Sequence, residues 1–280
     1  MSMIFDLHVH SDFSDSSRTV EEALYEAKKK KIELLSFVDH DTTETYPYAK
    51  DLARKFGITL IPGIEISAYD FSRKRKVHIL GYKYSLKASH IKALVTPLLK
   101  RRDENSRKQL ELIRGASYEV PEEKLRTSRN SLKTLYKQHI VFAMTQMPYT
   151  SSIYQLTYRK LFKDGGIAQR DIEYLDVFDA IQAIKKDDGV AVLAHPGQLN
   201  SYDLLPELLE VGLDGIEVYH PSHTKEDENR SRNLADKYGL GIFGGSDDHG
   251  IFGEDFMQGN LLLEKKTRDL LDIDNFTHIL

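Results

Sequence analysis

Histidine and carboxylate side chains recur along this sequence at spacings typical of metal ligands. His8 and His10 form a His-x-His pair, whose side chains share one face if the segment is a β-strand. The 280 residues include no cysteine, so a transition-metal site would have to use imidazole and carboxylate ligands. That set of donors suits zinc, manganese or iron.

Further candidates stand at the carboxyl ends of successive predicted strands or in the loops that follow, and one of them, His78, lies inside a strand. They are Asp15, His40, Glu65, His78, His195, His220, Asp247 and His249. Parallel strands bring their carboxyl ends to one face of a barrel, where enzymes of this architecture keep their active sites. Ions held there would activate water and stabilise a displaced oxygen, which indicates phosphate-ester hydrolysis.

Rival catalytic motifs are absent from the sequence. It contains no Gly-x-Ser-x-Gly elbow, no P-loop and no Gly-x-Gly-x-x-Gly segment after the first predicted strand. A serine hydrolase and a nucleotide-binding fold of those types therefore fit poorly.

The elements that must position these residues alternate between strand and helix. Apolar runs predict strands over residues 4–10, 34–38, 58–66, 77–82, 190–193, 215–219 and 241–244. Amphipathic segments predict helices over residues 19–31, 48–56, 177–186, 204–211 and 226–238. Thr19 and Glu22 form a capping box for the first helix, and Gly57 is placed to end the second. This alternation predicts an α/β fold with a parallel sheet, open or closed into a barrel.

The middle of the chain has a different pattern. Strand signals are scarce between residues 87 and 172, and the run Lys100-Arg101-Arg102-Asp103-Glu104 is typical of a solvated helix. We therefore expect a barrel domain formed by residues 1–86 and 173–280, interrupted by a mostly helical insertion subdomain of residues 87–172.

The composition limits the partners of the chain. A net charge of −4 provides no basic field for duplex nucleic acid, although a nucleotide or short oligonucleotide would fit a local pocket. No stretch approaches the ~20 apolar residues of a membrane span, and the first residues do not form a secretory signal. We expect cytoplasmic residence and a small phosphorylated substrate, while the oligomeric state stays open.

Seven short segments resemble, in order, those of the PHP (polymerase and histidinol phosphatase) domain family. They are His8-Val9-His10-Ser11, Ser14-Asp15, Val38-Asp39-His40-Asp41-Thr42, Gly63-Ile64-Glu65, His78-Ile79-Leu80-Gly81, Ala194-His195-Pro196 and Gly245-Ser246-Asp247-Asp248-His249. The resemblance implies a distorted (β/α)7 barrel with two to three divalent metal ions, either Mn, Fe or Zn.

The resemblance also implies which residues hold these ions. The nine ligands divide into three groups: His8, His10 and Asp247 for one ion; His78 and His195 for a second, which Glu65 bridges to the first; and Asp15, His40 and His249 for the third.

Within the family, the sequence resembles most the branch of nucleotide and oligoribonucleotide phosphatases. The resemblance implies hydrolysis of 3′,5′-bisphosphate nucleotides or trimming of short RNA from the 5′ end. The sequence departs from that branch at Lys137-Gln138-His139, where Arg-Pro-His is usual, and at Ser16, where glycine is usual.

Several residues outside the ligand set are candidates for contact with the substrate. His220 and His223 would donate a proton to the leaving oxygen or contact phosphate, although both also suit a loop that leads into a helix. Arg18 and His139, and less readily Lys137, would bind phosphate. The carboxylates expected to orient imidazoles are Asp39, Asp41 and Asp248. The tyrosines expected either to stack a base or to pack are Tyr149, Tyr154 and Tyr158.

Two alternatives to a nucleotide phosphoesterase stay open. A histidinol-phosphate phosphatase, or another small-metabolite phosphatase, would use the same metal site without contacting a nucleobase. A non-catalytic, metal-stabilised PHP module would hold the ions and hydrolyse no phosphoester.

Overall fold

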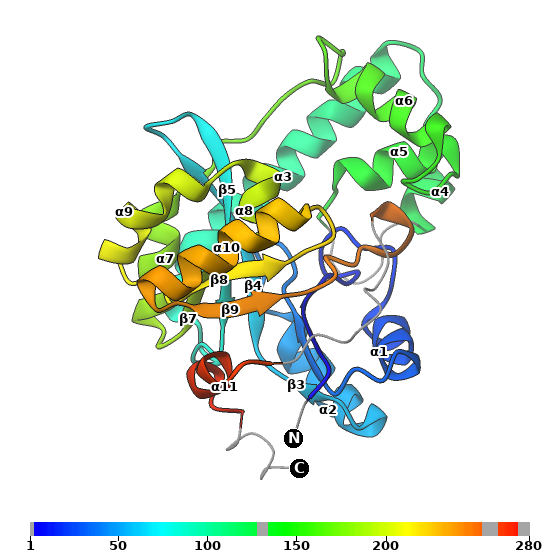
Figure 1. The fold of residues 1–280 in the computed structure, drawn as a ribbon. Helices are drawn as coiled ribbons and strands as arrows, with labels where there is room; N and C mark the ends of the chain where they lie inside the picture. Colours follow the sequence, from blue (N-terminus) through cyan, green and yellow to red (C-terminus); the bar gives the residue numbers. More distant parts are fainter. Residues whose placement is uncertain (1–2, 128–133, 254–262, 274–280) are drawn as a thin grey trace.

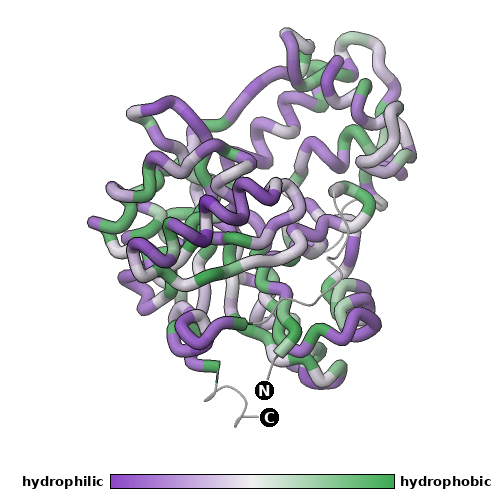
Figure 2. The backbone as a smooth tube through the Cα atoms, in the orientation of Figure 1, coloured by the Kyte–Doolittle hydropathy of each residue, from purple (hydrophilic) through white to green (hydrophobic). Residues whose placement is uncertain are grey.

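The computed structural model describes residues 3–127, 134–253 and 263–273. Its strands form two sheets, of three and six strands, and helices cover their outer faces (Figure 1). Hydrophobic residues gather along the strands, whereas hydrophilic residues dominate the outer helix α10 (Lys225–Tyr238), as Figure 2 shows. No helix within the described ranges is both long and apolar enough to cross a membrane.

The smaller sheet contains the first three strands, all parallel. They are β1 (Phe5–Val9), β2 (Leu34–Phe37) and β3 (Thr59–Leu60). Helices α1 (Val20–Lys29) and α2 (Thr45–Phe56) connect them and bury their apolar faces against the sheet. The predicted capping box is confirmed, because Thr19 accepts a hydrogen bond from the Glu22 amide and Glu22 accepts one from the Thr19 amide. Gly57 ends α2 in the left-handed conformation, as predicted.

The larger sheet contains the other six strands. In spatial order they are β6 (Leu175–Asp176), β4 (Gly63–Asp70), β5 (Arg75–Tyr82), β7 (Val190–Leu193), β8 (Gly215–Tyr219) and β9 (Gly241–Gly244). One strand departs from the predicted parallel sheet, because β5 runs antiparallel to both β4 and β7. The connection between β4 and β5 is too short for a parallel crossover, so the two strands form a hairpin.

The prediction of one strand over residues 58–66 is also wrong. The chain forms β3 and β4 with a break between them, at Ile61 and Pro62. Proline has no amide hydrogen to donate to a neighbouring strand, so the ladder is interrupted and the chain passes from one sheet to the other.

The second half of the chain follows the predicted alternation. Helices α7 (Val177–Lys186), α9 (Leu205–Glu210) and α10 pack on the larger sheet, and the turn η1 (Tyr202–Leu204) precedes α9. Shorter elements flank the loops after the strands, namely α8 (Pro196–Leu199), η2 (Gly250–Phe252) and α11 (Lys265–Leu271). The bounds of α7, β7, β8 and β9 agree with the predicted ones.

The two sheets meet at two isolated parallel bridges, an arrangement consistent with a distorted barrel. Val9 at the end of β1 pairs with Asp248 after β9, and His40 after β2 pairs with Glu65 on β4. Both bridges lie at the carboxyl ends of β1, β2 and β9. Both bridges are therefore made by residues beside the predicted metal ligands, while side chains from the two sheets also pack in one shared hydrophobic core.

Helices occupy most of the described residues between the two halves. They are α3 (Ser89–Gly115), α4 (Glu122–Thr127), α5 (Lys137–Thr145) and α6 (Ser152–Phe162). The start of α3, at Ile91 and Val95, packs in the core of the larger sheet, whereas Ile113 near its end packs with the other three helices. The division of the chain at residues 87 and 172 stays a prediction, and α3 contributes to both hydrophobic cores.

Candidate metal centre

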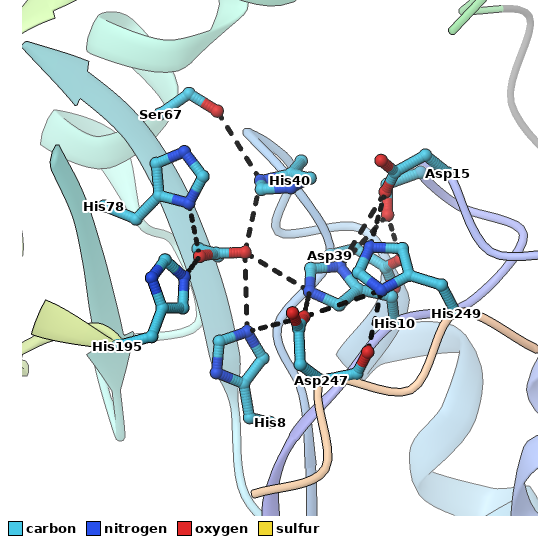
Figure 3. Close-up of polar contacts among 12 residues, drawn as sticks. His8, His10, Asp15, Asp39, His40, Ser67, His78, His195, Asp247 and His249 are labelled. Atoms are coloured by element: carbon cyan, nitrogen blue, oxygen red, sulfur yellow. Dashed lines mark hydrogen bonds and ion pairs between the residues drawn. The ribbon is translucent and has the colours of Figure 1, made fainter. Parts of the chain in front are cut away.

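The centre of the site is the carboxylate of Glu65, which projects from β4 and is buried among five imidazoles. The distances to its Oε1 are 2.7 Å from His78 Nδ1 and 2.9 Å from His195 Nε2. The distances to its Oε2 are 3.2 Å from His10 Nε2, 3.3 Å from His40 Nδ1 and 3.5 Å from His8 Nε2. In Figure 3, His78 and His195 lie on one side of this cluster, Asp15 and His249 lie on the other, and His40 lies between them.

Asp247, in the loop after β9, completes a first group of possible ligands. Its Oδ1 lies 3.2 Å from Nε2 of both His8 and His10, and these atoms together with a Glu65 oxygen lie within 4.8 Å of one another. Two ligands about 2.1 Å from one tetrahedral ion are separated by about 3.4 Å. The spacing of these donor atoms therefore matches a divalent ion held between them.

A second group forms around Asp15. Its Oδ1 lies 3.3 Å from His249 Nε2 and 4.0 Å from His10 Nδ1, and the four donors His10, Asp15, His40 and His249 lie within 4.8 Å of one another. His40, Glu65 and His78 form a third such group. The structure thus brings all nine predicted ligands into one cluster, whereas their division among particular ions stays a prediction.

The buried polar atoms of this cluster fit a bound cation. Within the described part of the chain, Nε2 of His8, Nε2 of His10 and Oδ1 of Asp15 are buried and have no hydrogen-bond partner. A buried polar atom without a partner costs about 1–3 kcal/mol, so native proteins rarely leave several side by side. All three atoms are strong metal donors, and ions bound in the two groups that contain them would satisfy them.

Hydrogen bonds on the outer side of the cluster fix the orientation of the imidazoles. His8 Nδ1 lies 3.0 Å from Glu217 Oε1, and His249 Nδ1 donates to the Asp247 carbonyl oxygen at 2.8 Å. With the proton on Nδ1, the Nε2 lone pair of each ring faces the cluster, as a metal ligand requires.

Glu217 was missed by the sequence analysis. It is fully buried in the middle of β8, where it also accepts a hydrogen bond from the His195 amide at 2.8 Å. The signal was an acidic residue inside the otherwise apolar strand segment Gly215-Ile216-Glu217-Val218. The sequence instead led us to expect that Asp39, Asp41 and Asp248 would orient the imidazoles.

Those three aspartates hold loops in place and do not form the expected hydrogen bonds that would orient imidazoles. Asp39 accepts hydrogen bonds from the Ser11 amide and from the hydroxyls of Ser11, Ser14 and Thr45. Asp41 accepts from the Ser67 amide and from Arg102, and Asp248 pairs with Arg18. These hydrogen bonds fix the loops after β1, β2 and β9, which contain predicted metal ligands.

The electrostatics of the cluster keep its carboxylates ionised. Burial opposes the ionisation of Glu65, but the imidazoles of His40, His78 and His8 outweigh it and hold the pKa of Glu65 well below its usual value. Asp247 has a lowered pKa for the same reason. Burial also opposes the protonation of His249, yet Asp15 and Asp247 raise its pKa to about 10. Metal binding would therefore compete with protons on imidazoles.

The two predicted proton donors lie in different surroundings. His220 Nδ1 accepts a hydrogen bond from the Ser222 amide at 3.1 Å, so its Nε2 carries the proton in the neutral form, and that atom lies 3.3 Å from Asp247 Oδ2. Both ring nitrogens of His223 are used by the backbone, Nδ1 by the Val218 carbonyl and Nε2 by the Gly197 amide. The Nε2–H of His220 therefore faces the cluster, whereas the ring of His223 holds a loop in place through hydrogen bonds to the backbone.

A cavity of about 440 Å³ opens beside the cluster. Asp15, His40 and His78 line it together with basic and aromatic residues, namely Lys76, Arg102, Lys137, Lys163, Tyr136, Tyr158 and Tyr174. Of the three tyrosines proposed to stack a base, Tyr158 lines this cavity and Tyr154 is buried among the helices. Tyr149 lines a neighbouring hollow with His220.

The predicted phosphate-binding pair does not line this cavity. Arg18 is paired with Asp248 and lies beside a separate groove along α1. His139 is buried at the start of α5, where it accepts a hydrogen bond from the Tyr136 amide and packs against Phe252. The neighbouring Lys137 and Gln138 line the cavity instead, and Gln138 Nε2 donates to Asp15 Oδ2 at 2.8 Å.

Arg102 also departs from the sequence analysis, which placed it on a solvated helix. Its guanidinium reaches from α3 into the cavity and donates to Asp41 Oδ2 at 2.8 Å and to Ser67 Oγ at 2.7 Å. The charged run Lys100-Arg101-Arg102-Asp103-Glu104 does not indicate which of its side chains turns toward the cavity.

Two solved structures share this fold. One, from Bifidobacterium adolescentis, is assigned as a metal-dependent phosphoesterase and superposes with a TM-score of 0.84 at 23% identity, over 96% of this chain and 95% of the other. The second is an amidohydrolase from Chromobacterium violaceum with bound sulfate and no metal, and superposes with a TM-score of 0.83 at 25% identity, over 95% of each chain. The fold class predicted from the sequence is thereby confirmed.

The chain belongs to the PHP domain family, whose model matches residues 6–199. It is 49% identical over 251 residues to the phosphoribosyl 1,2-cyclic phosphate 1,2-diphosphodiesterase of Eggerthella lenta, across 90% of this chain and 96% of that relative. It is 29% identical over 263 residues to the 3′,5′-nucleoside bisphosphate phosphatase of Chromobacterium violaceum, across 87% and 86% of the two chains. The prediction of a metal-dependent phosphoesterase is confirmed at the level of the enzyme class.

Proposed function

We propose that this protein hydrolyses a small phosphorylated ribose, and that its first candidate substrate is a phosphoribosyl 1,2-cyclic phosphate. The observation that carries the proposal is a cluster of metal ligands that opens directly into a basic cavity of about 440 Å³. A cavity of this size suits a small ligand rather than a folded nucleic acid. The choice of substrate is supported by the name of the Eggerthella lenta relative, which is 49% identical to this chain over 251 residues.

The nine clustered residues would hold two or three divalent ions, of manganese, iron or zinc. Such ions polarise a phosphoryl oxygen and lower the pKa of water to near neutrality when bound. Glu65 has both oxygens directed at imidazoles from different groups, which suits a carboxylate that bridges two ions. Residence in the cytoplasm is part of the same proposal.

The residues of the chain would then guide the displacement at phosphorus. In a cyclic diester, the oxygen of water forms a bond to phosphorus and one ester P–O bond breaks, which opens the ring and leaves a monoester. The released ribose oxygen needs a proton, and the Nε2–H of His220 is directed at the same cluster. A second hydrolysis at the same site would release inorganic phosphate.

A panel of substrates tests the proposal. The manganese-loaded protein is given phosphoribosyl 1,2-cyclic phosphate, adenosine 3′,5′-bisphosphate, histidinol phosphate and a 5′-phosphorylated short RNA, and the products are followed by ³¹P NMR. We expect ring opening of the cyclic diester with the highest kcat/KM, and loss of that activity in His8→Ala. Turnover of histidinol phosphate alone would show that the proposed substrate is wrong. Full metal occupancy without any hydrolysis would show that the protein is a non-catalytic module.

A second candidate substrate is a nucleoside 3′,5′-bisphosphate. Tyr158 and Tyr174 line the cavity and offer aromatic faces on which a base would stack. The bisphosphate phosphatase of Chromobacterium violaceum also supports this candidate. The panel separates the two substrates, since this candidate requires a higher kcat/KM for the adenosine bisphosphate than for the cyclic diester.

The role proposed for His220 has its own test. His220→Gln should lower kcat for the ribose ester by about 10²–10⁴-fold, because the leaving oxygen loses its proton donor. The loss should be much smaller for p-nitrophenyl phosphate, whose leaving group needs no proton. Metal content, measured by mass spectrometry, should equal that of the unaltered protein. An equal loss for both substrates, or loss of metal, would exclude this role.

A further inference from the structure

Three lysines from separate elements converge on the cavity. Lys76 lies on β5, Lys137 is the first residue of α5, and Lys163 directly follows α6. All three line the same cavity as the metal-cluster residues His40 and His78. The metal cluster does not use these three positive charges, and only Lys137 was a candidate for phosphate binding in the sequence analysis.

The charges around these lysines are only partly balanced. Lys76 forms an ion pair with Asp171 at 2.8 Å, and Arg102 forms one with Asp41 at 2.8 Å. Lys137 and Lys163 have no ion-pair partner within residues 3–127, 134–253 and 263–273. Two positive charges in the cavity are therefore unpaired. A phosphate monoester carries about −1.5 to −2 charges at pH 7 and would balance them.

The surroundings of Lys137 show the effect of this unbalanced charge. Burial, followed by the nearby charge of Lys76, lowers the pKa of Lys137 to about 8. Lys163 and Arg102 contribute in the same direction, and Asp171 only partly opposes them. An anion bound among these groups would relieve their mutual repulsion.

The lysines are offset from the metal cluster by a short distance. Lys76 and His78 are two residues apart on β5, so they share one face of the strand and lie about 7 Å apart along it. A phosphate at the lysines is therefore a different group from the one that reacts at the cluster. Two phosphates joined through one ribose would span this offset.

We infer that Lys137 and Lys163, with Lys76 beside them, bind a second, non-reacting phosphate of the substrate. This inference rests on the proposed function, in which the first phosphate reacts at the histidine–carboxylate cluster. It identifies the substrate class as a ribose that carries two phosphate groups, one of them a terminal monoester. The lysines thus discriminate against substrates with a single phosphate.

A comparison of paired substrates tests this inference. Lys137→Met and Lys163→Met are assayed with adenosine 3′,5′-bisphosphate and adenosine 3′-monophosphate, and with ribose 1,2-cyclic phosphate with and without its 5-phosphate. For the doubly phosphorylated partner of each pair, we expect KM to rise by about tenfold to a hundredfold with little change in kcat. The kinetics of the singly phosphorylated partner should not change. Lys100→Met, on the exposed face of α3, is the charge-matched control and should behave as the unaltered protein.

A binding measurement keeps the inference separate from the proposed function. Ribose 5-phosphate is titrated into the metal-loaded protein by calorimetry, and its affinity should fall at least tenfold in the variant that carries both substitutions. If no substrate is hydrolysed but this loss of affinity is seen, the proposed function fails and the lysine subsite stands. If substrates are hydrolysed but the lysine variants treat both members of each pair alike, the subsite is excluded. An unchanged melting temperature confirms that the variants are folded.

Discussion

At the scale of single residues, Glu217 connects two ligands that approach from different strands. One of its oxygens faces His8 Nδ1 and the other accepts from the His195 amide. Burial opposes its ionisation, but the charge of His8 and the hydrogen bond from that ring lower the pKa of Glu217 to about 2. It is therefore an anion at neutral pH, which makes His8 a stronger donor to a metal.

Replacing this carboxylate by an amide should weaken metal binding. Glu217→Gln keeps the shape of the side chain but removes its charge, so metal affinity should fall by about 10–100-fold. Competition against a fluorescent chelator measures this change. Glu210→Gln, at the exposed end of α9, is the control and should retain full affinity. Equal affinity in both variants would limit Glu217 to a packing role.

The pKa of Lys137 predicts a pH dependence for substrate binding. With a pKa of about 8, Lys137 is charged below pH 8 and loses its charge as the pH rises through that value. The charged groups that face it are Lys76, Lys163, Arg102 and Asp171. KM for the doubly phosphorylated substrate should therefore rise above about pH 8. This inflection should be absent in Lys137→Met, and its persistence there would assign it to another group.

At the scale of elements, close contacts between neighbouring segments set the geometry of the site. Gly245 follows β9 and crosses β1 so closely that a Cβ atom there would lie 2.3 Å from both the Cβ and the amide nitrogen of His8. Gly63 is similar, since its Cβ would lie 2.1 Å from Ser36 Oγ. Glycine at these two positions allows strands from both sheets to approach each other beside the ligands.

An alanine at position 245 should separate these segments. Gly245→Ala should lower the free energy of unfolding by about 1–3 kcal/mol and reduce metal affinity, because His8 is the group that must move. Urea unfolding and the chelator competition measure the two effects. Gly115→Ala, where an added Cβ would meet nothing within 4 Å, should be neutral or slightly stabilising. A fully stable Gly245→Ala protein would contradict this account.

The sequence predicts the bounds of helices and strands well where a single local pattern of residues determines them. The bounds of α7, β7, β8 and β9 follow from amphipathic or apolar segments that have glycines at or near one of their ends. The direction of β5 could not be predicted, because the alternation of residues along a strand is the same in both directions. Seven of the nine clustered ligands follow or lie near the carboxyl ends of β1, β2, β7 and β9, where parallel strands share one end. The other two are Glu65, near the start of β4, and His78, inside the antiparallel β5, and the full set of nine was implied by the resemblance to the PHP family.

The residues that surround the cluster were harder to predict. Arg102, Lys137 and Lys163 come from helices between the two halves, and no local pattern indicates which charged side chains of a helix face a cavity. His139 was expected to bind phosphate, but it packs at the start of α5. Such contacts depend on how distant segments pack, and a single sequence does not record this.

At the scale of the whole molecule, the two sheets are joined by a shared hydrophobic core and by two isolated bridges, which lie beside a cluster of buried charges. Bound ions should therefore stabilise the whole fold, because they bind the folded chain and connect ligands from both sheets. At a free metal concentration a hundredfold above Kd, the gain is about 2.7 kcal/mol. This should raise the melting temperature by about 5–10 °C over the chelated protein.

Thermal unfolding with manganese or with a chelator measures this stabilisation. His8→Ala is the control, and should show a much smaller difference between the two conditions. Equal melting temperatures for the unaltered protein in both conditions would show that the sheets are held together without the ions.

Helix α3 is held in place at its first turns and again near its midpoint. Its 27 residues span about 40 Å. The first turns are packed into the core of the larger sheet, and near the midpoint Arg102 ties the helix to Asp41 and Ser67. A rigid swing of the cavity wall that α3 supports would therefore break the Arg102 contacts. We therefore expect substrate and product to exchange without a rocking of these helices as one rigid body.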